Sequence, residues 1–440
     1  MDVTAGDKGG HLTSVESRLL VALTLAALAA RLAWLWLEPR CQPSGDEPSW
    51  IAMASGHMAR LHKGLDPFRN GLLFYPPVYP YFLGVCFRLT RSLTAVLAAQ
   101  AVVGALLVPA VGRLGAQLFD RRVGLVAATV TAFYPELVWF STHFWSETLL
   151  LTLLWWGVER LLRADAPGGG ARTAFGAGAL CALATLTREP VLYLLPIAAA
   201  WLAWRRPGGL RRAGAFAAAA ALVILPWTAR NWVVFHAFVP VSTMGSFSLW
   251  QGNSTLTHLQ VYQALSGHDP VEQDRIARRK AWQAIGRRQP LWILEKVESE
   301  MPEFWKVGSE ALDQLVGRGS CGPLSRRAVM SLELLLGIPY LALAGGFLLG
   351  LVRAPASRGF WLVLLVLGGY NAVHVVALAT PRFRLPVLPA VILTACATVG
   401  SRLEPLDARR LVLLVLLVTY AALLLQPTLP ELALWRALTG

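Results

Sequence analysis

Charged side chains are scarce in this sequence of 440 residues. Asp, Glu, Lys and Arg together account for 15% of the chain, whereas hydrophobic residues account for 55%. Soluble domains carry about a quarter charged residues, so the composition excludes an ordinary soluble protein. It predicts a polytopic membrane protein instead.

Cysteine is scarce as well. The five cysteines lie far apart, without CxxC or metal-like spacing, so the sequence shows no disulfide framework and no cysteine-based metal site. Cys41 and Cys321 form the one pair that we consider for a disulfide between outward-facing residues.

A nucleic-acid partner is disfavoured by the distribution of the basic residues. The formal net charge is +14, but Lys and Arg occur in short clusters between apolar runs and not along one continuous surface. Such clusters are typical of topology signals in membrane proteins, in which Lys and Arg concentrate on the cytoplasmic side.

Eleven apolar runs are candidates for membrane-spanning helices, since about 20 residues are needed to cross the hydrocarbon layer. We interpret the first run as a span and not as a cleaved leader, because ten further spans would make a leader unnecessary. The runs cover residues 18–38, 93–118, 123–140, 148–163, 173–187, 190–204, 211–228, 328–351, 359–378, 384–401 and 410–426.

The segment 76–89 decides which side each loop faces. It is apolar but only about fourteen residues long and opens with two prolines, so its length favours a helix lying in the interface. If it does not cross, the arginine clusters of the later short loops all face the cytoplasm, as the charge rule requires. These clusters are Arg121 and Arg122; Arg160, Arg163 and Arg172; Arg205, Arg206, Arg211 and Arg212; Arg353 and Arg358; and Arg402, Arg409 and Arg410.

This topology predicts a cytoplasmic N-terminus and two large outer loops, 39–92 and 230–327. We divide the chain into an N-terminal membrane module (1–228), an outer helical loop (229–327) and C-terminal membrane helices (328–440). Helical spacing of apolar residues predicts a surface helix over Pro48–Leu61 and a helical subdomain over Val271–Trp305, with Pro290 breaking the run.

Acids and arginines gather at the predicted outer face. A carboxylate there could accept a proton from an attacking hydroxyl, and arginines could stabilise charge on a phosphate leaving group. The residues concerned are Asp46, Glu47, Glu147, Arg188, Glu189, Arg230, Arg382 and Arg384.

Structural alternatives remain open for the arginines. Arg382 and Arg384 could extend along a helix end to reach the interface, or they could bind an anion through their paired N–H donors. Arg188 could be a functional interfacial arginine, or it could form a structural ion pair with Glu189.

The acids have structural alternatives too. Glu147 could simply favour the N-terminus of a helix that Ser146 caps. Asp46 and Glu47 could be the first-turn acids of the predicted surface helix. Their position beside the outer arginines favours a site in which carboxylates and a phosphate meet.

Several motifs, in order along the chain, resemble those of GT-C fold glycosyltransferases, the class of protein O-mannosyltransferases, aminoarabinose transferases and bacterial family 39 members. The stretch Pro226–Asn253 is similar to the pattern PWxxRNYxxFGxFVPVSTNGGxNLWxGN of the bacterial members. The other motifs are GDE at 45–47, YPPVYP at 75–80, YP at 134–135 with SE at 146–147, LTREP at 186–190 and PRFRLPVLP at 381–389.

The resemblance implies an inverting transfer of a sugar from a polyprenyl-phosphate donor to an acceptor lipid, glycan or protein at the outer face of the inner membrane. It implies Asp46 as the general base, and a supporting role for Glu47 and Glu147. The remaining expected site residues are Arg188, Arg230, Arg382 and Arg384 for the carrier phosphate, and Tyr75 and Tyr79 in the substrate loop.

No metal site is expected, because the outer loops lack a DxD motif, although some members of the class use a divalent cation. Two other functions remain open. An O-antigen polymerase or ligase would also carry outward arginines, but its chemistry would lie in the late loop. A lipid-linked sugar transporter or flippase would place its charges near mid-membrane, whereas here they are expected at one interface.

Overall fold

The computed structural model describes residues 13–38, 43, 45–54, 72–317, 324–400 and 403–425. All regular secondary structure in these ranges is helical, which confirms the predicted all-α membrane fold. The two cysteines considered for a disulfide, Cys41 and Cys321, lie outside the described residues, whereas Cys86, Cys181 and Cys396 are free thiols.

Every predicted apolar run forms helix. Two runs are divided into two helices, and two others contain short 3-10 turns. The helices are α1 (Ser14–Leu37), α4 (Leu93–Ala105), α5 (Leu107–Leu118), α6 (Arg121–Phe133), α7 (Pro135–Phe140), α8 (Glu147–Asp165), α9 (Ala171–Thr185), η1 (Glu189–Tyr193), α10 (Leu194–Ala203), α11 (Gly209–Phe235), α17 (Arg326–Arg353), α18 (Arg358–Val376), η3 (Pro381–Val387), α19 (Leu388–Cys396), η4 (Ala397–Val399) and α20 (Ala408–Leu425).

Among the described residues, six helical segments are both long and apolar enough to cross a membrane, so the chain has the character of a multi-pass membrane protein. The other five predicted spans are also helical, and the total of eleven stays a prediction. The six segments are Ser14–Leu37, Leu93–Leu118, Gly209–Phe235, Arg326–Arg353, Arg358–Val376 and Pro381–Val399.

Local sequence explains where several of these helices begin. Thr13 and Glu16 form a reciprocal capping box at the start of α1. The side chains of Ser92 and Asp120 accept backbone hydrogen bonds at the first turns of α4 and α6. Pro135, which has no backbone N–H, starts α7 and separates it from α6.

Small residues allow the long helices to pack closely. A Cβ atom on Gly178 of α9 would lie 2.2 Å from the carbonyl oxygen of Phe216 in α11. A Cβ atom on Gly124 of α6 would lie 2.5 Å from the carbonyl oxygen of Gly112 in α5. Both glycines let two backbones approach each other, a common device where membrane helices cross.

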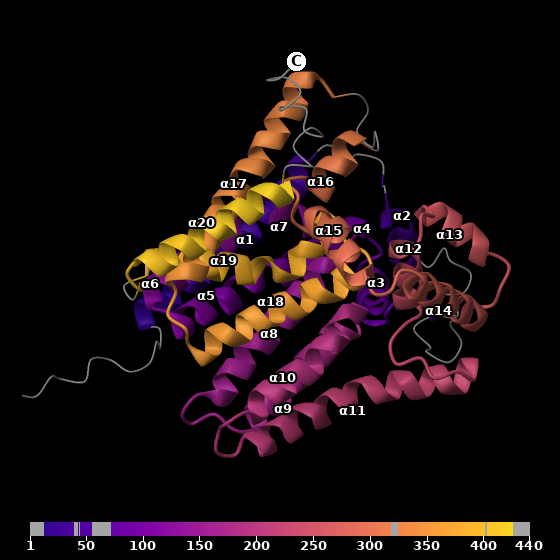
Figure 1. Ribbon diagram of the computed structural model, residues 1–440, viewed down its shortest axis with the longest axis horizontal. Coiled ribbons are helices and arrows are strands. Elements are labelled where there is room, and N and C mark those ends of the chain that lie inside the picture. The colour runs from indigo at the N-terminus through magenta and orange to yellow at the C-terminus, as the bar shows by residue number, and fades with distance from the viewer. Residues whose placement is uncertain are drawn as a thin grey trace, which may run out of the picture.

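Shorter helices fill the two predicted outer loops. In Figure 1, α12, α13 and α14 lie together at one side of the molecule. Residues Val271–Trp305 are largely helical, as predicted, with the expected break near Pro290. The outer helices are α2 (Glu47–Ala54), α3 (Val78–Thr90), α12 (Met244–Gly252), α13 (His258–Leu265), α14 (Pro270–Arg287), α15 (Trp292–Trp305), α16 (Glu310–Leu312) and η2 (Asp313–Gly317).

One predicted boundary differs from the structure, and another falls on residues that are not described. Helix α11 does not end at residue 228 but continues to Phe235, so Arg230 lies inside a helix. His236, which follows Phe235, ends the helix with a left-handed φ of 54°. Helix α2 is described only as far as Ala54, and the rest of the predicted surface helix, residues 55–61, lies outside the described residues. Trp50 of α2 is buried against α3.

Candidate active site

Four charged side chains from distant parts of the sequence meet at one place. Asp46 precedes α2, Glu147 opens α8, Arg188 precedes η1, and Arg382 lies in η3. Arg382 Nη1 donates to Asp46 Oδ2 at 3.1 Å, and its Nε lies 3.3 Å from Glu147 Oε1. Arg188 Nη1 donates to the same Glu147 oxygen at 2.5 Å. We refer to these four residues as the acid–arginine cluster.

Aromatic rings hold the two guanidinium groups of the cluster. The central carbon of Arg382 lies 4.4 Å from the ring centroid of Trp145 and 5.2 Å from that of Phe383. The guanidinium carbon of Arg188 lies 5.3 Å from the ring centroid of Phe383. At these distances the ring faces attract a cation and limit its movement. Sequence reasoning missed both rings, although Trp145 stands two residues before Glu147 and Phe383 directly follows Arg382.

The members of the cluster differ in their exposure. The Glu147 side chain is 1% exposed and those of Arg188 and Arg382 are each 14% exposed, whereas that of Asp46 is 39% exposed. Asp46 is therefore the carboxylate of the cluster that a molecule arriving from outside can reach most easily. Glu147 is enclosed, and its negative charge balances the buried guanidiniums.

The local backbone explains why Arg188 joins the cluster while its neighbour does not. Arg188 is extended, with φ −148° and ψ 125°, so consecutive side chains leave the backbone on different sides. Glu189 accepts hydrogen bonds from the Ser242 hydroxyl at 2.8 Å and from the Gly245 backbone N–H at 3.2 Å. The pairing of Arg188 with Glu189 considered from the sequence is therefore wrong, because Arg188 pairs with Glu147.

A second correction concerns the start of α8. Glu147 does occupy the first turn of this helix, as expected, but the Ser146 side chain makes no capping hydrogen bond. The Ser146 hydroxyl instead lies 3.5 Å from Glu147 Oε2 and 3.5 Å from Arg188 Nη1. The reason is that Ser146 has helical dihedral angles, whereas a capping serine is extended.

Glu47 and Tyr75 support the exposed end of the cluster. Glu47 Oε1 accepts a hydrogen bond of 3.0 Å from the Phe144 backbone N–H, which ties the start of α2 to the loop before α8. The Tyr75 ring packs against Trp50, with 4.7 Å between ring centroids. Burial, with a smaller contribution from the Asp46 charge, raises the pKa of Tyr75 to about 12, so its hydroxyl keeps its proton.

Tyr79 has a different environment. Its side chain is buried, and its hydroxyl donates to Gln100 Oε1 at 2.8 Å. The Gln100 amide in turn donates to the Phe140 carbonyl at 3.0 Å. Tyr79 therefore joins α3 to α4 and to the end of α7, behind the cluster.

The structure does not bring Arg384 into the acid–arginine cluster. Its Nη2 donates to the Gly308 carbonyl at 2.8 Å and lies 3.4 Å from Glu136 Oε1, and its Nη1 donates to the Lys306 carbonyl. Its guanidinium carbon lies 4.1 Å from the ring centroid of Tyr340. These contacts join η3 to the segment that follows α15.

Arg230 also lies apart from the cluster. Its Nη1 donates to the Leu72 carbonyl at 2.7 Å and to the side-chain oxygen of Asn231 at 2.9 Å. Its guanidinium carbon lies 4.6 Å from the ring centroid of Trp227. Arg230 thus connects α11 to the chain that leads into α3.

The described residues contain no group of three His, Cys, Asp or Glu side chains that could hold a metal ion. At the cluster, the cation between the two carboxylates Asp46 and Glu147 is the Arg382 guanidinium. The arrangement can therefore offer a reachable carboxylate beside two fixed cations.

Comparison with known proteins supports the predicted resemblance. Residues 75–232 match the family model described as dolichyl-phosphate-mannose-protein mannosyltransferase, which is about a third of the chain. No curated protein sequence matches the chain significantly.

Among solved structures, the chain is similar to the oligosaccharyltransferase AglB from Archaeoglobus fulgidus. The form in complex with an inhibitory peptide and a dolichol-phosphate has a TM-score of 0.53 and 14% identity, over 93% of this chain and 55% of that one. The apo form has a TM-score of 0.50 and 17% identity, over 92% and 54%. ArnT from Cupriavidus metallidurans bound to undecaprenyl phosphate is more distant, with a TM-score of 0.42 and 14% identity, over 88% and 78%.

The fold is thus the GT-C type that the motifs predicted. The chain spans about half the length of the archaeal oligosaccharyltransferases that it matches.

Proposed function

We propose that this protein is an integral membrane glycosyltransferase that moves a sugar from a polyprenyl-phosphate donor to an acceptor at the extracytoplasmic face. The observation that carries the proposal is the acid–arginine cluster, in which a reachable carboxylate lies beside two enclosed guanidiniums. The GT-C fold and the match of residues 75–232 to a mannosyltransferase family model support it. So does the dolichol-phosphate named in the AglB complex, which is a lipid phosphate of the same class.

Asp46 is the proposed general base. It takes the proton from an acceptor hydroxyl as the oxygen of that hydroxyl bonds to the anomeric carbon of the sugar. The bond between that carbon and the phosphate oxygen breaks, and its electron pair leaves with the carrier phosphate. Attack from the side opposite the phosphate inverts the anomeric configuration.

Arg188 and Arg382 are the proposed contacts for the leaving phosphate. Guanidinium groups suit phosphate because two parallel N–H donors can bind two oxygens at once. The rings of Trp145 and Phe383 hold these cations in place before the donor arrives, so little reorganisation is needed as charge develops. Arg230 and Arg384 already donate to backbone carbonyls, and we assign them to support the site.

Glu147 is the proposed counter-ion of both arginines. It contacts each of them while being almost fully enclosed, so it sets their spacing without competing for the acceptor. Glu47 holds α2, and with it Asp46, against the loop before α8. We place the site on the extracytoplasmic side of the inner membrane because the arginine-rich short loops would then face the cytoplasm.

The test replaces Asp46 by Asn, which keeps the shape of the side chain but removes its basicity. Cells that lack the gene are complemented with the unmodified chain, with Asp46→Asn, or with Glu298→Gln, an exposed acid of α15 that serves as the charge-matched control. Mass spectrometry then compares polyprenyl-phosphate sugars and finished glycans. We expect Asp46→Asn to behave like the empty vector, with the donor accumulating and the product missing, at unchanged protein levels.

Full activity of Asp46→Asn would contradict the assignment of Asp46 as the general base. Glu298→Gln should complement fully, because this exposed side chain is not one of the four residues of the cluster. An unchanged pool of lipid-linked sugars in the gene deletion, together with saturable uptake of such lipids by reconstituted vesicles, would favour a transporter instead.

A further inference from the structure

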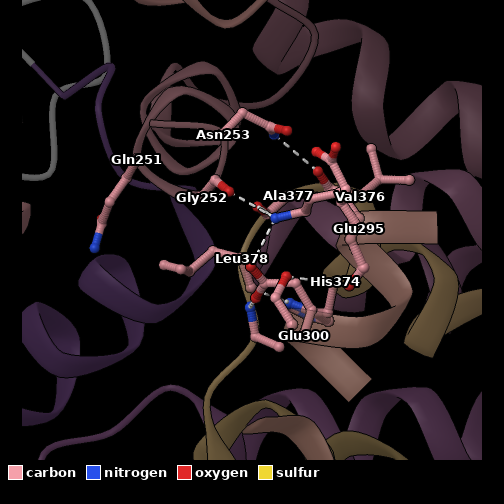
Figure 2. Close-up of polar contacts among 12 residues, drawn as sticks. Gln251, Gly252, Asn253, Glu295, Glu300, His374, Val376, Ala377 and Leu378 are labelled. Atoms are coloured by element: carbon pink, nitrogen blue, oxygen red, sulfur yellow. Dashed lines mark hydrogen bonds and ion pairs between the residues drawn. The ribbon is translucent and has the colours of Figure 1, made fainter. Parts of the chain in front are cut away.

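A buried polar joint connects the outer helices to the segment that carries Arg382. Figure 2 shows this joint, where the end of α12 meets the backbone that follows α18. We refer to it as the outer joint, and it consists of the side chains of Asn253, Lys296 and Glu300, the residue Gly252, and the backbone of residues 376–379.

Asn253 uses both ends of its side-chain amide in the joint. Its Nδ2 donates to the Leu249 carbonyl at 2.9 Å and to the Val376 carbonyl at 3.0 Å. Its Oδ1 accepts from Arg288 Nη2 at 2.9 Å and from Trp292 Nε1 at 2.7 Å. One side chain thereby connects α12, α15, the end of α14 and the end of α18.

Lys296 and Glu300 form an ion pair inside the joint. Lys296 Nζ donates to Glu300 Oε1 at 2.7 Å, to the Gly252 carbonyl at 2.6 Å and to the Ala377 carbonyl at 3.2 Å, so all three of its protons are used. The other oxygen, Glu300 Oε2, accepts from the Ala379 backbone N–H at 2.6 Å. Lys296 is 1% and Glu300 8% exposed, and buried charges need such complete pairing.

Gly252 lies in direct contact with the backbone that follows α18. A Cβ atom at this position would lie 1.7 Å from the Ala377 carbonyl oxygen. The backbone of α12 therefore rests directly on the backbone that follows α18. This contact falls on Ala377 and Leu378, and the ion pair bonds to Ala377 and Ala379.

The joint ends three residues before Arg382. After Ala379 the chain passes through the extended Thr380 and enters the 3-10 turn η3, in which Arg382 is the second residue. The hydrogen bond from Ala379 to Glu300 therefore sets the position from which η3 starts. A displaced start would carry the guanidinium away from Asp46 and Glu147, because the turn itself is short and tightly wound.

We propose that Lys296 and Glu300 are positioning residues that hold Arg382 in place for a lipid-linked phosphate. This inference rests on the proposed function, since it assigns Arg382 to the carrier phosphate. Neither residue touches the acid–arginine cluster in the described structure. Their effect passes through the backbone of residues 377–381.

The test uses the purified full-length chain. The probe is undecaprenyl phosphate, a lipid carrier without a sugar. Binding of this lipid is measured for the unmodified chain, Glu300→Leu and Glu300→Gln. Hydrogen exchange of peptides that contain residues 377–383 is followed in parallel, because the Ala379 amide is the donor to Glu300. The matched control is Glu303→Gln, which removes another α15 carboxylate, the one that lies 3.1 Å from Lys306 Nζ at the end of the helix.

Glu300→Leu should weaken binding of undecaprenyl phosphate at least tenfold and speed exchange at Ala379 by a similar factor. Glu300→Gln keeps an oxygen that can accept from Ala379, so both effects should fall to about threefold. Glu303→Gln should leave both quantities unchanged. If Glu300 only stabilised the fold, Glu300→Leu would lower the protein yield. The folded protein that remained would still bind undecaprenyl phosphate as tightly as the unmodified chain.

Unchanged binding in the two Glu300 variants, or unchanged exchange at Ala379, would overturn the proposal. If Glu300→Leu does not accumulate, Glu300→Gln decides by the same two measurements. If the unmodified chain fails to bind undecaprenyl phosphate, the proposed function fails, and the exchange of the 377–383 peptides still shows whether Glu300 holds this segment.

Discussion

At the scale of single residues, the contacts of Arg382 explain why the candidate site has an arginine at this position. Its guanidinium contacts Asp46 and Glu147 through different nitrogen atoms while its face lies on Trp145. A lysine ammonium is a compact charge without this planar fork, so it could not make the same set of contacts. The sequence indicated that arginines and acids share a face, but it could not indicate which arginine contacts which acid.

Gly252 provides a prediction at the same scale. Gly252→Ala should destabilise the protein by about 1–3 kcal/mol, because the added methyl group meets a backbone oxygen that no side-chain rotation can move. Thermal unfolding of the purified protein, followed by tryptophan fluorescence, measures the change.

The control for this substitution is Gly286→Ala in α14, where no atom lies within 4 Å of the new Cβ. Alanine there should be neutral or should stabilise the helix by up to about 1 kcal/mol. An unfolding temperature of Gly252→Ala at or above that of the unmodified protein would contradict the contact between α12 and residue 377.

At the scale of elements, short interruptions build the site. The 3-10 turn η3 places Arg382 and Arg384 before α19, and they contact different partners. Helix α3 is 13 residues long, which agrees with the prediction that segment 76–89 is too short to cross a bilayer. Its Tyr79 and Leu83 are buried against α2 and α4, so α3 is packed into the protein and not merely laid on its surface.

The sidedness of the helices gives a prediction of its own. Reporter fusions placed after Arg122 and after Arg212 should both report a cytoplasmic location, because we predict that α3 does not cross and that the arginine clusters therefore obey the charge rule. A phosphatase that works only outside the cytoplasm and a fluorescent protein that matures only inside it supply the two readouts. If either fusion reports the outside, the predicted topology is wrong, and the acid–arginine cluster, in which Asp46 contacts Arg382, does not lie on the face that we propose.

At the scale of the whole molecule, the fold collects residues from four separate regions at one end of a helical bundle. Asp46, Glu147, Arg188 and Arg382 are separated by up to 336 positions in the sequence. Helices α12 and α15 contact the backbone that follows α18 at the outer joint, which ends at Ala379, three residues before Arg382 of the cluster. One carboxylate open to one side is the arrangement expected of an enzyme that takes both substrates from that side.

This arrangement predicts one-sided activity. In vesicles with the chain inserted in one direction, a polyprenyl-phosphate sugar in the leaflet that faces Asp46 should support transfer. The same donor confined to the other leaflet should give at least tenfold less product, because the four residues of the cluster lie together at one site. Product analysis after selective labelling of each leaflet checks this. Equal transfer from both leaflets would contradict a single outward site and would favour a transporter.

The sequence by itself determined the class of protein and most of its helices. Long apolar runs and scarce charge require a membrane, and helical spacing, prolines and capping residues show where many helices begin and end, because these signals act between residues close in the sequence. It also predicted that acids and arginines gather at the outer face. Glu300 carried no such signal, because its partner Ala379 is a backbone group 79 positions away.

Only the tertiary structure decided which of these charges meet. It placed Arg188 on Glu147 instead of Glu189, and it gave Arg384 to Glu136 and backbone carbonyls while Arg382 reached Asp46. The physical reason is that an ion pair depends on where two side chains end in space, which is set by how helices pack and where they break. Local sequence patterns contain no information on those distances.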